Sequence, residues 1–163
     1  MRRKDREMQN INEIFDILLR CDTIRIGIQG GEYPYVVPVS FGAELVGERP
    51  VIYFHCAREG QKLNLIEKNP NVCIEADRFI RTDSTGHGIT TRYESVIGFG
   101  RCRFAESEDE ILHGMQLFIN HYGYTDYPLQ QCQSLRGLKL GVVEIDTVSG
   151  KRNLPAVSAA TEE

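Results

Sequence analysis

The hydrophobic positions along this 163-residue chain follow two different periods. Over residues 5–20 they recur every three or four positions, as they do on one face of an amphipathic helix. From residue 24 onward they mostly alternate with polar positions or form short runs, which is typical of β-strands. Six strands are predicted in this way, at residues 24–28, 35–41, 51–54, 71–76, 94–104 and 138–145. Two more helices are predicted, one at residues 63–68 and one that opens with a capping box of Ser107 and Glu110 and ends near Tyr122.

Most of the predicted strands are separated by short connections rich in turn residues. Such connections favour antiparallel pairing, and many short strands favour a small barrel over a doubly wound sheet. Pro38 cannot donate a ladder hydrogen bond, so its strand is expected at a sheet edge, at a bulge or at an interruption near a site. Residues 80–91, rich in Thr, Asp, Ser, Gly and His, are expected to form a loop. The pattern predicts one mainly β domain with flanking helices over residues 1–155, and a disordered tail at residues 156–163.

The composition argues against several classes of function. The formal net charge is −4, whereas a protein that binds nucleic acid broadly needs a basic face. No apolar run reaches the length of a membrane span, and the first residues lack the apolar core of a signal peptide. The five cysteines are scattered, with neither a C-x-x-C motif nor a Cys/His spacing typical of zinc. We therefore expect a cytoplasmic protein with no metal site, no nucleic-acid partner and no membrane partner.

The stretch from His55 to Lys62 is the most informative for chemistry, because it joins an apolar strand to a helical run. Backbone N–H groups at a helix start are unpaired, and the helix dipole favours an anion there. Gly60 lets an anion approach the backbone. Lys62 supplies a positive charge, and Arg58 is a candidate for a second one. His55, at the end of the strand, adds a hydrogen-bond donor. This arrangement suits the phosphate of a cofactor, although neither the P-loop nor the Rossmann spacing is present. The alternative is an ordinary strand-to-helix turn whose basic side chains face solvent.

Residues spread through the chain also resemble a known family. The H-x-A-x-x-G-x-K spacing of His55, Ala57, Gly60 and Lys62 is the most specific part, and the Y-E-S-V-I-x-F-G run at residues 93–100 is the next. The fit extends over about residues 5–153 and includes residues 35–41, 53–62, 69–73 and 92–100. The chain resembles the FMN-binding split-barrel proteins related to pyridoxamine 5'-phosphate oxidase, and within them the nitroimidazole-resistance (Nim) type.

The resemblance implies a six-stranded antiparallel split β-barrel that works as a homodimer, with FMN bound near the subunit interface. It implies that Lys62 and its neighbours hold the flavin phosphate, that the ring lies along residues 37–40, and that His55 is the candidate catalytic residue. The cofactor-binding residues that it implies are Val37, Pro38, Val39, Ser40, His55, Cys56, Ala57, Gly60, Lys62, Tyr93 and Ser95. Oxidases of the pyridoxamine type use additional arginines and a longer C-terminal segment for the substrate phosphate, so we do not expect that activity here.

Two functions from different classes remain open. In the first, FMN passes electrons from a donor to a small nitroaromatic acceptor such as a nitroimidazole, and the protein is an oxidoreductase. In the second, the protein binds FMN or haem as a carrier or sensor without turnover, because no acid–base pair beyond His55 is evident. A structural barrel with an empty pocket is a third reading.

Three groups of residues have alternative interpretations. Cys56 is either a reactive thiol or, as is more common, a packing residue. Arg78, Arg81 and Arg92 flank the expected loop, where they either help to hold an anion from the partner subunit or face solvent. The aromatic residues near the end of the last helix either cover the barrel or form a substrate wall; they are Phe118, Tyr122, Tyr124 and Tyr127.

Overall fold

The computed structural model describes residues 3–132, 135 and 137–155, so the expected tail at residues 156–163 lies outside the described part. Its helices are α1 (Ile11–Leu19), α2 (Gln61–Lys68) and α3 (Glu108–His121), with the short 3-10 helices η1 (Lys4–Arg6) and η2 (Leu129–Gln131). Its strands are β1 (Glu7–Met8), β2 (Ile24–Ile28), β3 (Tyr35–Val39), β4 (Gly42–Val46), β5 (Arg49–Ala57), β6 (Asn71–Ser84), β7 (Ile89–Phe104) and β8 (Leu138–Asn153). Among the described helices, none has the length and apolar character needed to cross a membrane.

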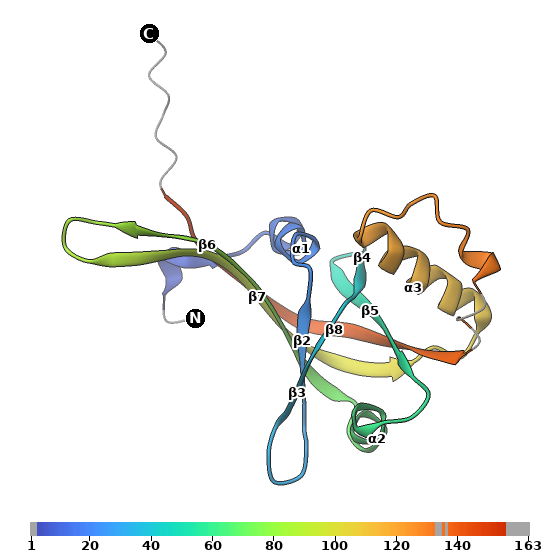
Figure 1. Ribbon diagram of the computed structural model, residues 1–163. Helices are drawn as coiled ribbons and strands as arrows, with labels where there is room; N and C mark the ends of the chain where they lie inside the picture. Colours follow the sequence, from blue (N-terminus) through green and yellow to red (C-terminus); the bar gives the residue numbers. More distant parts are fainter. Residues whose placement is uncertain (1–2, 133–134, 136, 156–163) are drawn as a thin grey trace.

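The strands form one antiparallel sheet in the order β3-β2-β6-β7-β8-β5-β4, and β1 is added to β8 (Figure 1). The strands at the two ends of this order, β3 and β4, are consecutive in the chain and are separated only by Ser40 and Phe41. The sheet therefore curls until its two edges approach each other, which gives a split barrel. Pro38 lies on β3 opposite Arg25 of β2, and β3 is an edge strand, which is the first of the three positions predicted from the missing proline N–H.

Strand β5 is buried on both faces because it separates two hydrophobic cores. Ile52, Phe54 and Cys56 point into the barrel, where they pack with the inner faces of the sheet and with apolar side chains of α1 and α2. Val51 and Tyr53 point outward into a second core, which α3 closes from outside (Figure 1). Burial of both faces explains why this strand appears in the sequence as a continuous apolar run instead of an alternating one.

The prediction of a loop at residues 80–91 is wrong, because β6 and β7 continue through this region as a hairpin. The two strands pair as far as Ser84 opposite Ile89, so only residues 85–88 form the turn. The hairpin projects from the barrel (Figure 1), and most of its side chains there are exposed. Since neither face of this ribbon is covered, its strands lack the hydrophobic alternation by which a strand is recognised.

The prediction of a first helix over residues 5–20 is partly wrong. The helix α1 begins at Ile11, because the side chain of Asn10 accepts hydrogen bonds from the backbone N–H groups of Asn12 (2.9 Å) and Glu13 (3.4 Å). The residues before this cap form η1 and β1, and β1 pairs with β8.

The strand β4 has no counterpart among the predicted strands. Its first residue, Gly42, lies so close to α3 that a Cβ atom there would overlap the backbone of Phe118. Over the described residues the sheet thus has eight strands where six were predicted. Strand β1 has only two residues, and β4, although as long as β2 and β3, lacks a regular alternation of apolar and polar positions. All six predicted strands are present, and the predicted class, a mainly β antiparallel split barrel with flanking helices, is confirmed.

Candidate functional site

The connection between β5 and α2 has the strand–turn–helix form that the sequence predicts. Gly60 is the N-cap of α2, and no side chain caps the helix there. Its φ angle of 144° is one that residues with side chains rarely adopt, and a Cβ atom there would have no neighbour within 4 Å. The turn therefore leaves the first N–H groups of the helix without a side-chain cap and leaves open space beside the glycine. Both features suit a bound anion.

Lys62 adds a positive charge to this turn. Its Nζ atom lies 5.3 Å from the centroid of the Phe54 ring. Within the described residues no carboxylate forms an ion pair with Lys62, whereas Lys139 pairs with Glu67 (3.4 Å). The lysine charge is thus available to a ligand at the start of α2.

The protonation states of His55 and Cys56 follow from burial and from this lysine. Partial burial lowers the pKa of His55, and the charge of Lys62 lowers it further, so the imidazole is neutral at pH 7. Burial raises the pKa of the Cys56 thiol, and the opposing effect of Lys62 and Lys139 is smaller. Cys56 points into the barrel core, which favours the packing interpretation over a reactive thiol.

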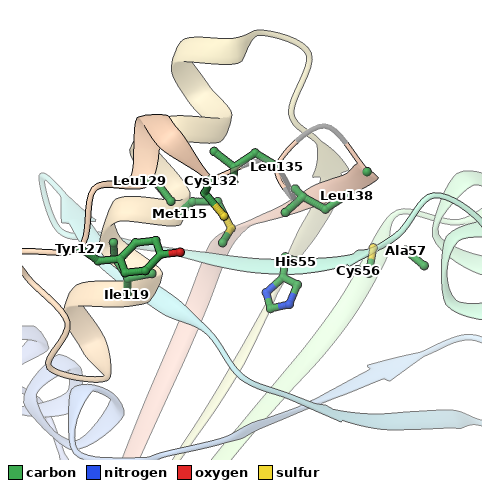
Figure 2. A pocket seen from close by; sticks show the side chains of 11 residues that line it. His55, Cys56, Ala57, Met115, Ile119, Tyr127, Leu129, Cys132, Leu135 and Leu138 are labelled. Atoms are coloured by element: carbon green, nitrogen blue, oxygen red, sulfur yellow. The ribbon is translucent and has the colours of Figure 1, made fainter.

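A cavity of about 780 Å³ opens beside the end of β5, between α3 and the segment that follows it (Figure 2). Figure 2 shows the His55 ring at its edge, with the Tyr127 side chain on the opposite side. The rest of the described lining is mostly apolar; it consists of Cys56, Ala57, Met115, Ile119, Leu129, Cys132, Leu135, Gly137 and Leu138. The structure thus brings together His55, Cys56 and Ala57, followed directly in the chain by the turn with Gly60 and Lys62.

Aromatic side chains of α3 connect His55 to the link between β3 and β4. The rings of His55 and Phe118 have centroids 4.8 Å apart, and those of Phe118 and Tyr122 have centroids 5.3 Å apart. The Tyr122 hydroxyl accepts a hydrogen bond from the backbone N–H of Phe41 (3.1 Å) and donates one to the backbone oxygen of Asp22 (2.7 Å). Tyr127 lines the cavity, as in the substrate-wall alternative, whereas Phe118 packs against His55 and is not among the described lining residues. Tyr122 has a structural role, and Tyr124 is exposed.

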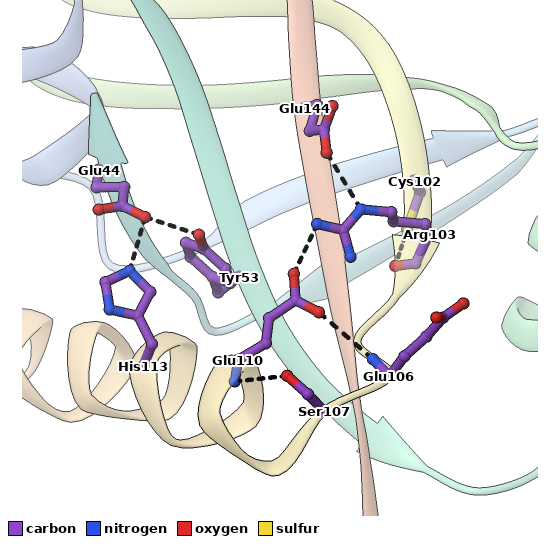
Figure 3. Close-up of polar contacts among 9 residues, drawn as sticks. All are labelled: Glu44, Tyr53, Cys102, Arg103, Glu106, Ser107, Glu110, His113 and Glu144. Carbon is purple, nitrogen blue, oxygen red and sulfur yellow. Dashed lines mark hydrogen bonds and ion pairs between the residues drawn. The ribbon is translucent and has the colours of Figure 1, made fainter. Parts of the chain in front are cut away.

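Polar contacts fix α3, and with it one wall of the cavity, to the sheet (Figure 3). Glu44 on β4 accepts a hydrogen bond from the Tyr53 hydroxyl (2.7 Å), and its carboxylate lies 2.8 Å from Nε2 of His113. Burial opposes ionisation of Glu44, but these two contacts outweigh it and lower its pKa. At the start of α3, Ser107 accepts a hydrogen bond from the backbone N–H of Glu110 (3.2 Å), which confirms the N-cap half of the predicted capping box. The Glu110 carboxylate accepts a hydrogen bond from the backbone N–H of Glu106 (3.4 Å) where the capping box predicts Ser107.

The other expected cofactor contacts lie elsewhere in the chain. On β3, Val37 and Val39 pack against the barrel core, and Pro38 is exposed, as is Ser40 directly after the strand. On β7, Tyr93 and Ser95 are half-buried; they are paired with β6 on one side and with β8 on the other. None of these six residues is among the described residues that line the cavity.

The three arginines that the sequence suggested as anion ligands form ion pairs within the chain. Arg81 and Arg92 both pair with Asp83, at 2.6 and 2.7 Å, and Arg78 pairs with Glu94 (3.2 Å). Among the described residues, no group of three His, Cys, Asp or Glu side chains has the arrangement of a metal site.

The family of this chain follows from a comparison of its sequence with known protein families. The profile of the family described as pyridoxamine 5'-phosphate oxidase matches residues 10–152, which is most of the chain. The chain belongs to the pyridoxamine 5'-phosphate oxidase family. No match was found among curated proteins.

Solved structures related to this family share the fold. A protein from Bacteroides thetaiotaomicron VPI-5482, named as a candidate 5-nitroimidazole antibiotic resistance protein, is 28% identical, with a TM-score of 0.76 over 89% of this chain and 85% of its own. A flavocytochrome from Azotobacter vinelandii is 14% identical, with a TM-score of 0.79 over 94% of this chain and 72% of its own. An FAD-binding protein from Mesorhizobium loti is 18% identical, with a TM-score of 0.67 over 91% of this chain and 98% of its own. At their identities, the last two comparisons show the fold alone.

Apart from Tyr127, the sequence did not single out as site residues those that α3 and the following segment contribute to the cavity. Met115 and Ile119 are apolar positions at helical spacing, which the pattern assigns to the core. In the structure both border the cavity, and Met115 also belongs to the second core. Helical spacing alone cannot distinguish a side chain that packs in a core from one that lines a cavity.

Proposed function

We propose that this member of the pyridoxamine 5'-phosphate oxidase family binds FMN and reduces small nitroaromatic acceptors. The observation that carries the proposal is the uncapped, glycine-led start of α2 with Lys62, directly after the strand end that borders an apolar cavity. The 28% identical relative named for 5-nitroimidazole resistance supports this choice of acceptor. The names of the flavocytochrome and of the FAD-binding protein support a flavin as the cofactor.

The turn between β5 and α2 fits the phosphate of FMN. A phosphate dianion needs several N–H donors and a compensating positive charge. The first turn of α2 offers N–H groups without a side-chain cap, and Lys62 offers a charge that no described carboxylate neutralises. The space beside Gly60 would let the phosphate approach the backbone.

A homodimer would explain why the expected contacts lie in two parts of one chain. Pro38 on β3, Ser40 just after β3 and Ser95 on β7 are not among the described residues that line the cavity at the end of β5. On the sheet that carries them, Val36 is 58% exposed and Phe99 is 56% exposed. These two lie in one row across the sheet, since Val36 is opposite Gly27, Gly27 opposite Cys73 and Cys73 opposite Phe99. Such a row would be covered in a dimer, and a flavin between subunits would then contact both groups of residues.

The cavity and His55 determine what the protein adds to the chemistry. Bound FMN would supply hydride or electron transfer. The apolar lining would exclude water and suit a flat, uncharged acceptor. His55, neutral because of its lowered pKa, would donate a hydrogen bond to the reacting group or hold a proton at a ring nitrogen.

The second candidate is a carrier or sensor that binds flavin or haem without turnover. The observation in its favour is that no hydrogen bond to the His55 ring is found among the described residues, so no proton relay to it is evident. An anaerobic experiment separates the two candidates. The FMN-loaded protein is reduced with dithionite and mixed with a nitroimidazole, and we expect reoxidation much faster than that of free reduced FMN. Reoxidation no faster than that of free FMN would favour the carrier.

A further inference from the structure

Glu94 is a buried charge with an unusual set of partners. It is only 1% exposed, and it is the one charged side chain among the described residues that is classed as buried. Its Oε1 atom accepts hydrogen bonds from Arg152 Nε (3.0 Å) and Arg20 Nη2 (3.3 Å), and its Oε2 atom accepts one from Arg78 Nη1 (3.2 Å). Three guanidinium groups therefore hold one carboxylate, which removes most of the cost of its burial.

The three arginines come from three different elements. Arg20 is the C-cap of α1, Arg78 lies on β6, and Arg152 lies near the end of β8. Glu94 itself lies on β7, directly opposite Arg78 in the β6–β7 ladder and opposite Arg152 in the β7–β8 ladder. The carboxylate thus ties α1 and three neighbouring strands together at one point.

This point is where the β6–β7 hairpin leaves the barrel. Ala76 and Val96 form the last apolar pair of the ladder whose side chains are both buried in the core. One step further along the inner face comes the Arg78–Glu94 pair, and the register shifts immediately afterwards, between Phe79 and Arg81. At the base of the hairpin, the ion pairs of Glu94 therefore take the place of the hydrophobic packing that holds the strands together inside the barrel.

The orientation of Glu94 also determines that of its two neighbours on β7. Successive side chains of a strand point to opposite faces, so the inward position of Glu94 directs Tyr93 and Ser95 outward. Both are expected cofactor contacts, and Lys151 lies over the Tyr93 ring, with its Nζ atom 5.5 Å from the centroid. A rotation of the β7 backbone here would pull a buried carboxylate away from its three partners, which is costly.

We propose that Glu94 is a positioning residue, which holds the Tyr93–Ser95 segment of β7 in the orientation that the cofactor requires. The inference rests on the proposed function, because it takes Tyr93 and Ser95 as flavin contacts. It goes beyond that function in assigning a role to a residue that is turned away from the cofactor and to the arginines of α1, β6 and β8.

The test compares Glu94→Gln with Glu75→Gln. The first variant keeps the shape of the side chain but removes the charge that binds the three arginines. The second removes a carboxylate from the same sheet, where Glu75 forms an exposed pair with Arg25 (2.9 Å). Amide hydrogen exchange of residues 93–95 in the flavin-free protein measures local order, and FMN titration measures the site. Circular dichroism at the same temperature shows that each variant is folded.

We expect faster exchange at residues 93–95 and about tenfold weaker FMN binding in Glu94→Gln, with neither change in Glu75→Gln. Unchanged exchange would overturn the proposal. Faster exchange with unchanged FMN affinity would also overturn it, because Glu94 would then contribute to folding alone. If Glu94→Gln does not fold, Arg78→Gln, which leaves two arginines on the carboxylate, is judged by the same two results. Wild-type protein that binds no FMN would instead contradict the proposed function, and this is seen before any variant is compared.

Discussion

The Nζ atom of Lys62 lies 5.3 Å from the centroid of the Phe54 ring, at the start of α2. Phe54 is fully buried in the barrel core, so this contact holds the half-buried lysine over the end of β5 instead of leaving it extended into solvent. An ammonium group held beside an aromatic ring and partly shielded from water attracts an anion more strongly than a fully solvated one. The contact between Lys62 and Phe54 therefore keeps a full positive charge next to the uncapped N–H groups of the helix.

Replacing Lys62 by Ala should weaken FMN binding by about ten- to a hundredfold, because a hydrogen bond to a charged group contributes about 1.5–3 kcal/mol. The measurement is a fluorescence titration of FMN at fixed ionic strength. Lys68→Ala is the control, since Lys68 is an exposed lysine in the last turn of the same helix, away from its N-terminal N–H groups, and its loss should leave affinity unchanged. Equal affinities for Lys62→Ala and wild-type protein would show that the phosphate is not held here.

Replacing Gly60 by Ala should reduce both stability and FMN affinity. The φ angle of 144° would strain any residue with a Cβ atom, at a cost of about 1–3 kcal/mol. Gly86→Ala is a matched control, because Gly86 also has a positive φ (78°) but lies in the hairpin turn. Urea unfolding should show a loss of stability in both variants, whereas FMN titration should show weaker binding in Gly60→Ala alone. Weaker binding in both would indicate a general effect of strain and not a phosphate contact.

Replacing Glu44 by Gln should destabilise the protein in a pH-dependent way. The pKa of Glu44 is lowered in the folded state from its ordinary value of 4.5, so its stabilising contribution is complete above that value. The contribution is lost as the pH falls through the lower folded pKa. We expect Glu44→Gln to lower the free energy of unfolding by about 1 kcal/mol at pH 7, since the group is partly exposed, and by much less in strong acid. Urea unfolding at both pH values measures this, and a difference that does not depend on pH would contradict the role of the ionised carboxylate.

Replacing Gly141 by Ala should destabilise the protein, because a Cβ atom there would overlap the Phe54 ring. Overpacking of this kind typically costs about 1–3 kcal/mol. Gly137→Ala is the control, since a Cβ atom at that position meets no neighbour. The two variants are compared by thermal unfolding, and equal melting temperatures would show that the core around Phe54 adjusts without cost. Because Phe54 also contacts Lys62, a displaced ring should weaken FMN binding in Gly141→Ala as well.

Structural features that depend on residues close together in the chain could be predicted from the sequence. The turn from His55 to Lys62 was predictable because an apolar strand, a glycine and a helical run follow one another directly. The start of α3 was predictable because Ser107 and its cap partner are three residues apart. The edge position of β3 is one of the three alternatives that the missing N–H of Pro38 allowed, and the sequence alone did not choose among them.

Contacts between segments that are far apart in the chain could not be predicted from the sequence. His55 contacts Phe118, which is 63 positions later in the chain, and no local pattern indicates that contact. The buried position of Glu94 depends on arginines from α1, β6 and β8, which only the sheet order brings together. The hairpin of β6 and β7 was missed because exposed strands have no core that would impose alternation on them.

Binding of FMN by this chain can be tested with a visible absorption spectrum. The spectrum of the purified protein is recorded, FMN is added, the excess is removed, and the spectrum is recorded again. We predict two flavin bands that stay with the protein and that are largely lost from Lys62→Ala. A Soret band would instead favour haem and the carrier function. A colourless protein that retains no added FMN would contradict the proposed function, and the turn from His55 to Lys62 would then be an ordinary connection between a strand and a helix.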